Sequence, residues 1–227
     1  MPIPDLKTLT GLTEGRGLVP ISREILGDTE TPVSAYLKIR SKGPFSFLFE
    51  SVEGGEKIGR YSFLGVEPFL IFRSRGNVIQ IDDLKNGEKH SLTADPKLEL
   101  RKLLDRFRSA HVEGLPRFTG GAVGYVGYDA IRLIEEIPET TDDDLAMDDI
   151  LLLFYDTLLA FDNIQHKIHL ISNVHVEGEL ESNYDEAVGR LSALEKMLKV
   201  PMDHPLSSGG SQCTIVSNTP KDDYLSK

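Results

Sequence analysis

The sequence predicts an α+β fold in which a mainly antiparallel sheet of hairpins is covered by helices that are segregated from the strands. Short apolar runs recur along the chain and are separated by turn residues such as Gly54-Gly55 and Asn86-Gly87, which is typical of β-hairpins. Helix signals are fewer, and they predict helices over residues 32–40, 96–108 and 183–199. Because these helices do not alternate with the strands, the pattern does not fit the parallel sheet of an α/β protein.

Length and composition limit the number of domains and the class of function. The 227 residues and 40% apolar content suffice for one large domain, or for one domain and part of another. The net charge of −11 argues against sequence-independent binding of nucleic acid, which depends on clustered Lys and Arg. No apolar stretch is long enough to span a membrane, and the N-terminus has no apolar core of the signal-peptide kind. The single cysteine, Cys213, excludes an internal disulfide, so the predicted compartment is the reducing cytoplasm.

The central feature of the sequence is a predicted hairpin over Phe45–Gly65. The apolar run of its first strand is followed at once by Glu50 and Ser51. A carboxylate in this position is expected to be partly buried, and a buried carboxylate needs a partner. Lys57 and Arg60 are the nearest cations. An ordinary hairpin with a surface ion pair is the alternative interpretation.

The flanking segments supply the predicted edge strand and the helix starts. Leu18–Leu26 is predicted to be an edge strand, because Pro20 lacks the backbone donor that a central strand needs. The first helix begins with Thr31-Pro32 and the second with Asp95-Pro96, each a cap followed by a proline. Asn183 is the predicted cap of the third helix. Further strands are expected over residues 69–72, 78–81, 150–154, 157–161 and 164–174, the last two as a hairpin.

A glycine-rich stretch, Phe118–Arg132, is the second informative segment. It lacks the Lys-Ser/Thr ending of a phosphate-binding P-loop and the spacing of a dinucleotide fingerprint. Glycines in a strand usually allow another backbone to approach, so the stretch is predicted to be a core strand followed by a short helix around Tyr128–Ile134. The acidic run Glu139–Asp149 is predicted to be an exposed loop, and the histidines show no ligand spacing. No metal site is therefore predicted in this chain.

The composition changes after residue 200. Residues 201–212 are rich in proline, serine and glycine, and they are predicted to form a linker or mobile loop. A strand over 213–216 and a helix start at Ser217 follow, but the sequence ends within two turns of that helix. This pattern is typical of a truncated chain. The predicted organisation is a domain over 1–200, the linker, and the start of a second domain over 213–227.

Residues 47–65, FLFESVEGGEKIGRYSFLG, closely resemble the Leu-Leu-Glu-Ser…Gly-Arg-Tyr-Ser-Phe segment of the anthranilate synthase component I family. Three further stretches are similar to the same family in the same order. They are Thr31–Lys38, FTGGAVGYVGYDAIR at Phe118–Arg132, and Ser217–Tyr224. Together these stretches span nearly the whole chain, and the resemblance is to the N-terminal region of the family.

The resemblance implies that the full-length parent converts chorismate and ammonia to anthranilate and pyruvate with Mg²⁺. A glutamine amidotransferase, component II, would supply the ammonia. The family's chorismate and metal ligands lie in its C-terminal part, so no catalytic or metal-binding residue is assigned in this chain. Residues 1–200 would be a regulatory domain holding half of an L-tryptophan inhibition site, and residues 213–227 would open the catalytic domain. Glu50 and Ser51 match the residues that hold tryptophan, and Lys57 or Arg60 would be the cation beside them.

The chemistry of these residues suits an amino-acid ligand. Glu50 can accept hydrogen bonds from the ligand's ammonium group, Ser51 can bond its polar end, and the apolar residues Phe47–Phe49 can receive an indole. Three alternatives remain. One is aminodeoxychorismate synthase component I, whose discriminating residues would lie past Lys227. The others are a stand-alone module that binds a small ligand and a structural sheet protein without a ligand.

Overall fold

The computed structural model describes residues 3–40, 43–50, 59–138, 143 and 145–201. The strands form two five-stranded sheets in which all paired strands are antiparallel. The first sheet has the order β1 (Leu18–Leu26), β10 (Lys167–His175), β9 (Thr157–Asp162), β3 (Tyr61–Val66) and β2 (Ser46–Phe49). The second has the order β6 (Glu88–Thr93), β5 (Val78–Asp83), β4 (Leu70–Arg75), β8 (Ile150–Tyr155) and β7 (Gly121–Val126).

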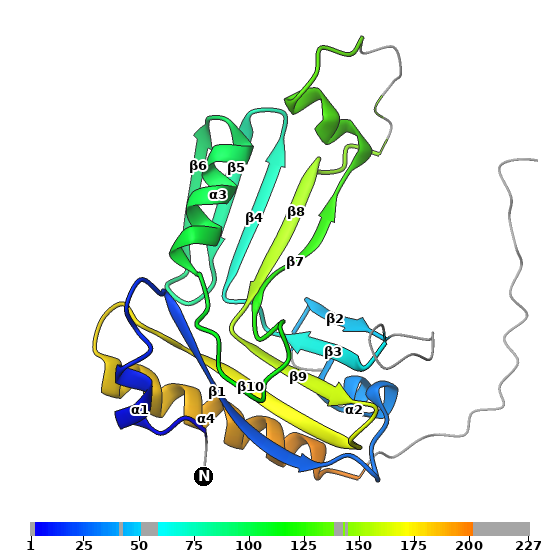
Figure 1. The fold of residues 1–227 in the computed structure, drawn as a ribbon. Coiled ribbons are helices and arrows are strands. Elements are labelled where there is room, and N and C mark those ends of the chain that lie inside the picture. The colour runs from blue at the N-terminus through cyan, green and yellow to red at the C-terminus, as the bar shows by residue number, and fades with distance from the viewer. Residues whose placement is uncertain (1–2, 41–42, 51–58, 139–142, 144, 202–227) are drawn as a thin grey trace, which may run out of the picture.

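The helices are segregated from the strands, so the predicted α+β class is confirmed. On one face of the first sheet, α1 (Leu6–Thr10), α2 (Pro32–Ile39) and α4 (Leu180–Leu198) enclose the larger core, as Figure 1 shows. On one face of the second sheet, α3 (Pro96–Arg106) encloses a smaller core through Leu103. We call the opposite face of each sheet its inner face. A short 3₁₀ helix, η2 (Tyr128–Leu133), follows β7 where the sequence predicts a short helix.

Helix starts follow the predicted capping signals in two of three cases. The Thr31 side chain accepts a hydrogen bond from the Ser34 backbone N–H, and the Ser34 hydroxyl in turn accepts one from the Thr31 N–H. Asp95 caps α3 by accepting from the Lys97 N–H at 2.9 Å. The prediction for α4 is wrong by one turn, because this helix begins at Leu180. Asn183 instead donates to the His175 carbonyl at 2.8 Å, which ties the first turn of α4 to the end of β10.

The structure confirms the predicted edge position of β1, but it places β7 differently from the prediction. β1, which contains Pro20, lies at the edge of the first sheet as predicted. The glycine-rich strand β7 is an edge strand of the second sheet, so its prediction as a core strand is wrong. The glycines do allow the backbone of the neighbouring strand β8 to come close, since a Cβ on Gly124 would lie 2.0 Å from the Leu151 carbonyl oxygen. A second correction concerns Arg73–Arg75, which lie between the predicted strands 69–72 and 78–81 and which belong to β4.

One residue, Asp156, separates β8 from β9 at the point where the chain passes from the second sheet to the first. Its buried carboxylate contacts His175 Nε2 at 3.0 Å and accepts a hydrogen bond from the Thr157 hydroxyl at 2.9 Å. Burial alone would raise the pKa of Asp156, but the His175 hydrogen bond and the charges of Arg190 and Lys85 outweigh it and lower that pKa. The two sheets are therefore joined at the buried Asp156 carboxylate, which is ionised and is stabilised by His175, Arg190 and Lys85.

Candidate functional site

The candidate site lies at the end of the β2–β3 hairpin. Glu50 directly follows β2, and Arg60 directly precedes β3. Ser51 and Lys57 belong to residues 51–58, which lie outside the described part of the chain. Glu50 is exposed, contrary to the expectation of partial burial. The reason is that β2 is an edge strand and the chain has left the core at Phe49, whose side chain is 55% exposed.

Arg60 is paired with Asp162, the last residue of the neighbouring strand β9. Its Nε and one terminal nitrogen donate to Asp162 Oδ2 at 3.0 and 2.5 Å, while Asp162 Oδ1 accepts from the backbone N–H groups of Ile164 and Gln165. Burial would raise the pKa of Asp162, but these hydrogen bonds outweigh it and hold that pKa below its ordinary value. No ion pair joins Arg60 to Glu50, both of which the structure describes. A ligand carboxylate would have to share Arg60 with Asp162.

A second contact fixes the base of the hairpin. The Asn163 backbone N–H donates to the Arg60 carbonyl at 2.9 Å, and the Asn163 side-chain amide donates to the Ser62 hydroxyl at 3.2 Å. The Arg60 guanidinium carbon lies 4.9 Å from the centroid of the Tyr61 ring, within the range of a cation–π contact. The turn between β9 and β10 thus holds the residues at which the β2–β3 hairpin re-enters the sheet.

An aromatic layer lies on the inner face next to this hairpin. The buried Phe47 ring packs edge-on against Tyr155 at 5.0 Å between centroids, and Phe63 packs edge-on against Phe118 at 5.4 Å. Burial, with a smaller contribution from Tyr36, raises the pKa of Tyr155 to about 12, so the phenol stays protonated at neutral pH. Edge-to-face aromatic packing of this kind offers a suitable surface for a further apolar ring.

His169 on β10 is a buried polar residue that the sequence analysis did not single out as a site residue. Among the residues that the structure describes, its Nδ1 has no hydrogen-bond partner, and the nearest carboxylate oxygen, Glu24 Oε1, lies 3.8 Å away. Burial lowers the pKa of His169, although the charge of Glu24 opposes that effect. The alternation of apolar residues along β10 predicts on which face of the sheet His169 lies. It does not predict that His169 Nδ1 lacks a hydrogen-bond partner among the described residues.

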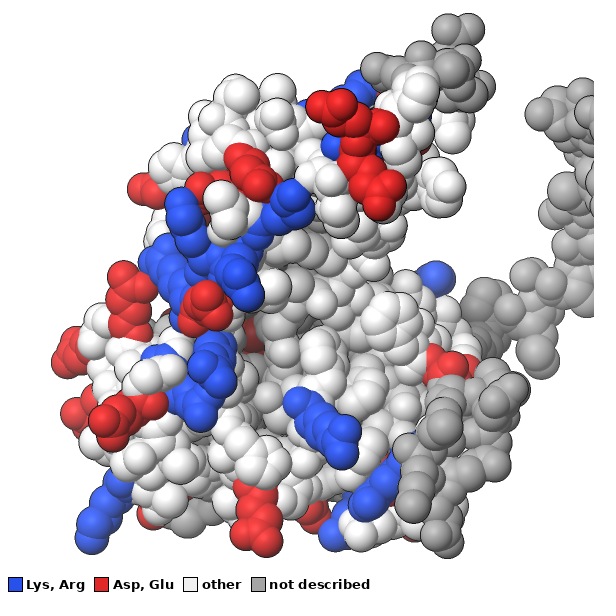
Figure 2. Space-filling model, turned by 45° about the horizontal axis from the view of Figure 1, so that its top comes forward, with Lys and Arg blue, Asp and Glu red and all other residues white. Residues whose placement is uncertain are grey.

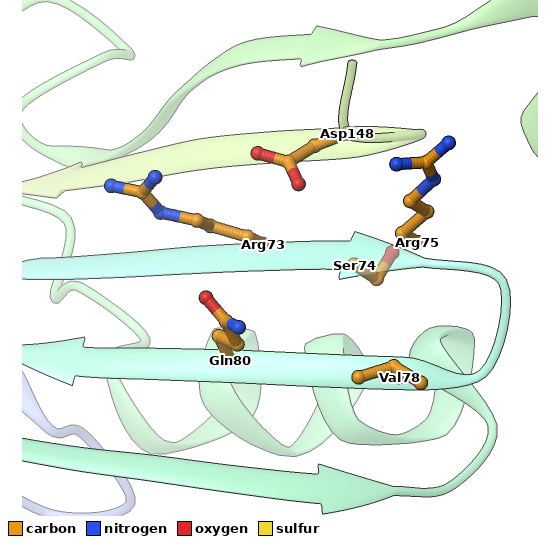
Figure 3. A pocket seen from close by; sticks show the side chains of 6 residues that line it. All are labelled: Arg73, Ser74, Arg75, Val78, Gln80 and Asp148. Carbon is orange, nitrogen blue, oxygen red and sulfur yellow. The ribbon is translucent and has the colours of Figure 1, made fainter. Parts of the chain in front are cut away.

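A separate pocket of about 270 Å³ lies on the second sheet, and in the view of Figure 3 the Arg73 side chain lies between those of Gln80 and Asp148. In the described part of the chain, Arg73 Nε is buried without a hydrogen-bond partner, and a terminal nitrogen of Arg73 lies 3.9 Å from Asp82. Arg75 forms an ion pair with Asp143. Carboxylates therefore oppose both guanidinium groups, and the pocket has no excess of positive charge for an anion.

Among the described residues, no group of three or more His, Cys, Asp or Glu side chains is arranged to hold a metal ion. The helices of the same residues include none with the length and apolarity needed to cross a membrane.

Comparison with known proteins gives one consistent result. Residues 46–227 match the family described as chorismate binding enzyme. The chain is 34% identical to anthranilate synthase component 1 of Acetivibrio thermocellus over 97% of its own length and 46% of that protein's. It is 38% identical to the protein of the same name from Pseudomonas putida, over 83% of this chain and 38% of that one.

A solved structure agrees with the sequence comparison. The crystal structure of anthranilate synthase component I from Streptococcus pneumoniae TIGR4 matches with a TM-score of 0.52 and 29% identity, over 79% of this chain and 37% of that one. The chain therefore spans less than half the length of the relatives that it matches. By sequence, extent of match and fold, the chain belongs to the anthranilate synthase component 1 family of chorismate-binding enzymes.

Proposed function

We propose that this chain is the N-terminal part of an anthranilate synthase that forms anthranilate and pyruvate from chorismate and ammonia. The observation that carries the proposal is the match of nearly the whole chain to less than half of an enzyme of that name. Residues 1–200 would form a regulatory domain, 201–212 a linker, and 213–227 the first part of the chorismate-binding catalytic domain. Residues 202–227, which contain most of the linker and the start of the second domain, lie outside the described part of the chain.

The reaction itself is assigned to the remainder of the parent. Mg²⁺ and chorismate would be bound there, with the metal stabilising the charge of substrate carboxylates. A glutamine amidotransferase would supply the ammonia. The cytoplasm is the proposed compartment, since the parent's substrates are small metabolites and this chain contains a single cysteine.

We assign L-tryptophan feedback inhibition to the end of the β2–β3 hairpin. Glu50 is exposed at the end of β2 and is therefore accessible to a ligand's ammonium group. The aromatic layer around Phe47 and Phe63 belongs to the same hairpin and would receive the indole ring. Because Arg60 is already paired with Asp162, Lys57 is the better candidate for the tryptophan carboxylate, with Ser51 bonding a polar end of the ligand.

Inhibition would follow from a difference in affinity between two states of the parent. A ligand shifts a conformational equilibrium only as far as it binds one state more tightly than the other. Tryptophan held between this domain and the catalytic domain would favour the arrangement in which both surfaces contact it. The catalytic arrangement would then lose population, in proportion to that difference in affinity.

The first test concerns catalysis. Incubated with chorismate, ammonium and Mg²⁺, the 227-residue chain is expected to form no anthranilate, because the residues assigned to chorismate are absent from it. Full-length parent protein under the same conditions is expected to form anthranilate, detected by fluorescence. Turnover by the 227-residue chain above a no-protein blank would contradict the division of labour proposed here, and an inactive parent would contradict the assigned reaction.

The second test concerns tryptophan inhibition in the full-length parent. Glu50→Ala and Ser51→Ala are expected to raise the tryptophan concentration for half inhibition by about tenfold or more, since each removes a hydrogen bond to a charged ligand group. The uninhibited rate should change little. Glu88→Ala, which removes an exposed carboxylate on β6, is the matched control. Superimposable inhibition curves for parent and variants would show that the tryptophan site lies elsewhere.

A further inference from the structure

The turn between β9 and β10 fixes the point at which the chain returns from the end of the β2–β3 hairpin. Tyr61, the first residue of β3, lies opposite Asp162, the last residue of β9. The Asp162 side chain is fully buried, whereas the Arg60 side chain that it binds is 36% exposed. Asp162 accepts from Arg60 through Oδ2 and from two backbone N–H groups of its own turn through Oδ1. One buried carboxylate therefore joins the turn to the start of β3.

Asn163 adds two contacts to the same stretch of chain. Its backbone N–H donates to the Arg60 carbonyl, and its side-chain amide donates to the hydroxyl of the buried Ser62. Gly59, which precedes Arg60, has a φ of +102°, a conformation that residues with a side chain rarely adopt. The backbone from Gly59 to Ser62 is thus held in one conformation by two residues that follow it by about 100 positions.

The outgoing side of the hairpin depends on the return side for its position. β2 is an edge strand of four residues, and its partner in the sheet is β3. Glu50 directly follows β2 and is exposed. Since β3 lies between β2 and β9, the place of Glu50 relative to the aromatic layer is set through β3. Asp162 acts at the end of β3 that lies next to the proposed tryptophan site.

The distribution of charge suggests how a ligand would use this hairpin. The face of the molecule that Figure 2 shows has a broad uncharged area between the two sheets, and most of the charged side chains lie around it. A ligand with an apolar ring and charged ends would place the ring on an uncharged surface and reach the charged side chains at its margin. Its affinity depends on how closely those side chains are held in the productive position. Resting on the tryptophan site proposed above, we infer that Asp162 is a positioning residue of that site, which acts on the hairpin through Arg60 and does not touch the ligand.

A competing role for Asp162 would give an effect of the opposite sign. If Asp162 only competed with the ligand carboxylate for Arg60, its removal would free the guanidinium group and tighten the binding of tryptophan. If Asp162 positions the hairpin, its removal loosens the start of β3 and weakens that binding. The direction of the change in tryptophan affinity therefore separates the two roles.

The test uses the full-length parent, with tryptophan as the probe. Asp162→Asn is expected to raise the tryptophan concentration for half inhibition by about tenfold, because Arg60 loses a charged partner. Asn163→Ala is a milder change at an exposed side chain and should raise it by about threefold. Glu195→Gln, which weakens the ion pair between α4 and Arg23 of β1, is the matched control and should leave inhibition unchanged.

Hydrogen exchange without tryptophan tests the hold on β3 separately from the ligand. Asp162→Asn should speed the exchange of backbone amides over residues 59–66 by about tenfold, and Glu195→Gln should not. Arg60→Gln should match Asp162→Asn in exchange and inhibition, and the double variant should add little to either single change, since both break one contact.

Three results would overturn the inference. They are a lower tryptophan concentration for half inhibition in Asp162→Asn, faster exchange with wild-type inhibition, and unchanged exchange with weakened inhibition. The last of these would make Asp162 a direct ligand contact. A wild-type parent that tryptophan does not inhibit would instead refute the proposed regulatory site, and the comparison of variants cannot produce that result.

Discussion

Burial controls the protonation of His169 more strongly than any charged neighbour does. Its imidazole is buried on β10, and burial lowers the pKa of His169 below the ordinary value of about 6.5 in spite of Glu24. The unfolded chain therefore takes up a proton as the pH falls through about 6.5, whereas the folded chain resists it. The contribution of His169 to the free energy of unfolding is therefore complete above about pH 6.5 and is lost progressively below it.

We expect the free energy of unfolding to fall between about pH 7.5 and pH 5.5, and the change His169→Gln to reduce that fall. A single proton contributes at most about 1.4 kcal/mol per pH unit. Urea unfolding of both proteins at the two pH values measures the difference. His90→Gln is the control, because the His90 side chain on β6 is exposed. Equal pH dependence in the wild type and in His169→Gln would contradict the assignment.

Individual contacts were the hardest feature to predict from the sequence. The position of Glu50 at the end of a strand follows from the apolar run before it, and the structure places it there. The partner of Arg60 could not be predicted, because Asp162 is 102 residues away in the sequence and reaches Arg60 only through the pairing of β3 with β9. Proximity in the sequence therefore pairs Arg60 with Glu50, whereas the fold pairs it with Asp162.

At the scale of elements, the backbone of β7 packs closely against β8. A Cβ on Gly124 would lie 2.0 Å from the Leu151 carbonyl oxygen and 2.9 Å from the carbonyl carbon. Both atoms are backbone, so the two strands would have to separate to admit a side chain. Gly189 in α4 is the opposite case, since apart from the adjoining residues and the backbone of its own helix no heavy atom of the protein lies within 4 Å of the position its Cβ would take.

Gly124→Ala is expected to lower the free energy of unfolding by about 1–3 kcal/mol, the usual cost of forced overpacking. Gly189→Ala is the matched control and should raise it by about 0.5–1 kcal/mol, because alanine favours the helix and restricts the unfolded chain. Urea unfolding curves of the three proteins provide the comparison. A Gly124→Ala variant as stable as the wild type would show that β7 pairs with β8 less closely than described.

Elements with strong local signals were predicted well. The caps at Thr31 and Asp95 and the turns between apolar runs placed two helices and most hairpins near their observed bounds. α1 was not predicted, since its five residues are too few to reveal a helical period, although Leu9 is buried in the core. The edge position of β7 was also not predicted. The glycines indicate that the backbone of a neighbouring strand comes close, but they do not indicate whether β7 has a neighbour on one side or on both.

At the scale of the whole molecule, the inner faces of the two sheets remain partly uncovered. Phe49 at the end of β2 is exposed, and the aromatic layer around Phe47 and Phe63 continues from it into the interior. Interfaces between domains bury about 600–1,500 Å². A surface of this composition is consistent with contact to the part of the parent that this chain does not include.

The 227-residue chain is therefore expected to self-associate and to bind tryptophan poorly. Losing two or three hydrogen bonds to charged groups would weaken binding by about 10²-fold or more. Sedimentation and calorimetry with tryptophan test the two parts, and Phe49→Ser should reduce the association. Micromolar binding of tryptophan by a monomer would identify the chain as a self-sufficient binding module and would contradict the shared-site proposal.

The arrangement of strands into two sheets was beyond sequence reasoning. The α+β class and the hairpins follow from local patterns, but the pairings of β1 with β10 and of β4 with β8 join distant segments. Such pairings leave no signal in a single sequence beyond the apolar character of each strand. The division into two sheets follows from a change of direction at Asp156, which the sequence shows only as one acidic residue between two apolar runs.

The pairing of β1 with β10 also sets an order of events during synthesis. Leu18–Leu26 finds its neighbour in the sheet only when Lys167–His175 has left the ribosome, about 140 residues later. At about 5–20 residues per second the nascent strand waits for roughly 7–30 seconds with its apolar face unpaired. During that interval the second sheet, whose strands lie between these two segments, can assemble first. The N-terminal strand of this protein is thus among the last to be incorporated, and it is the segment that a chaperone would have to protect.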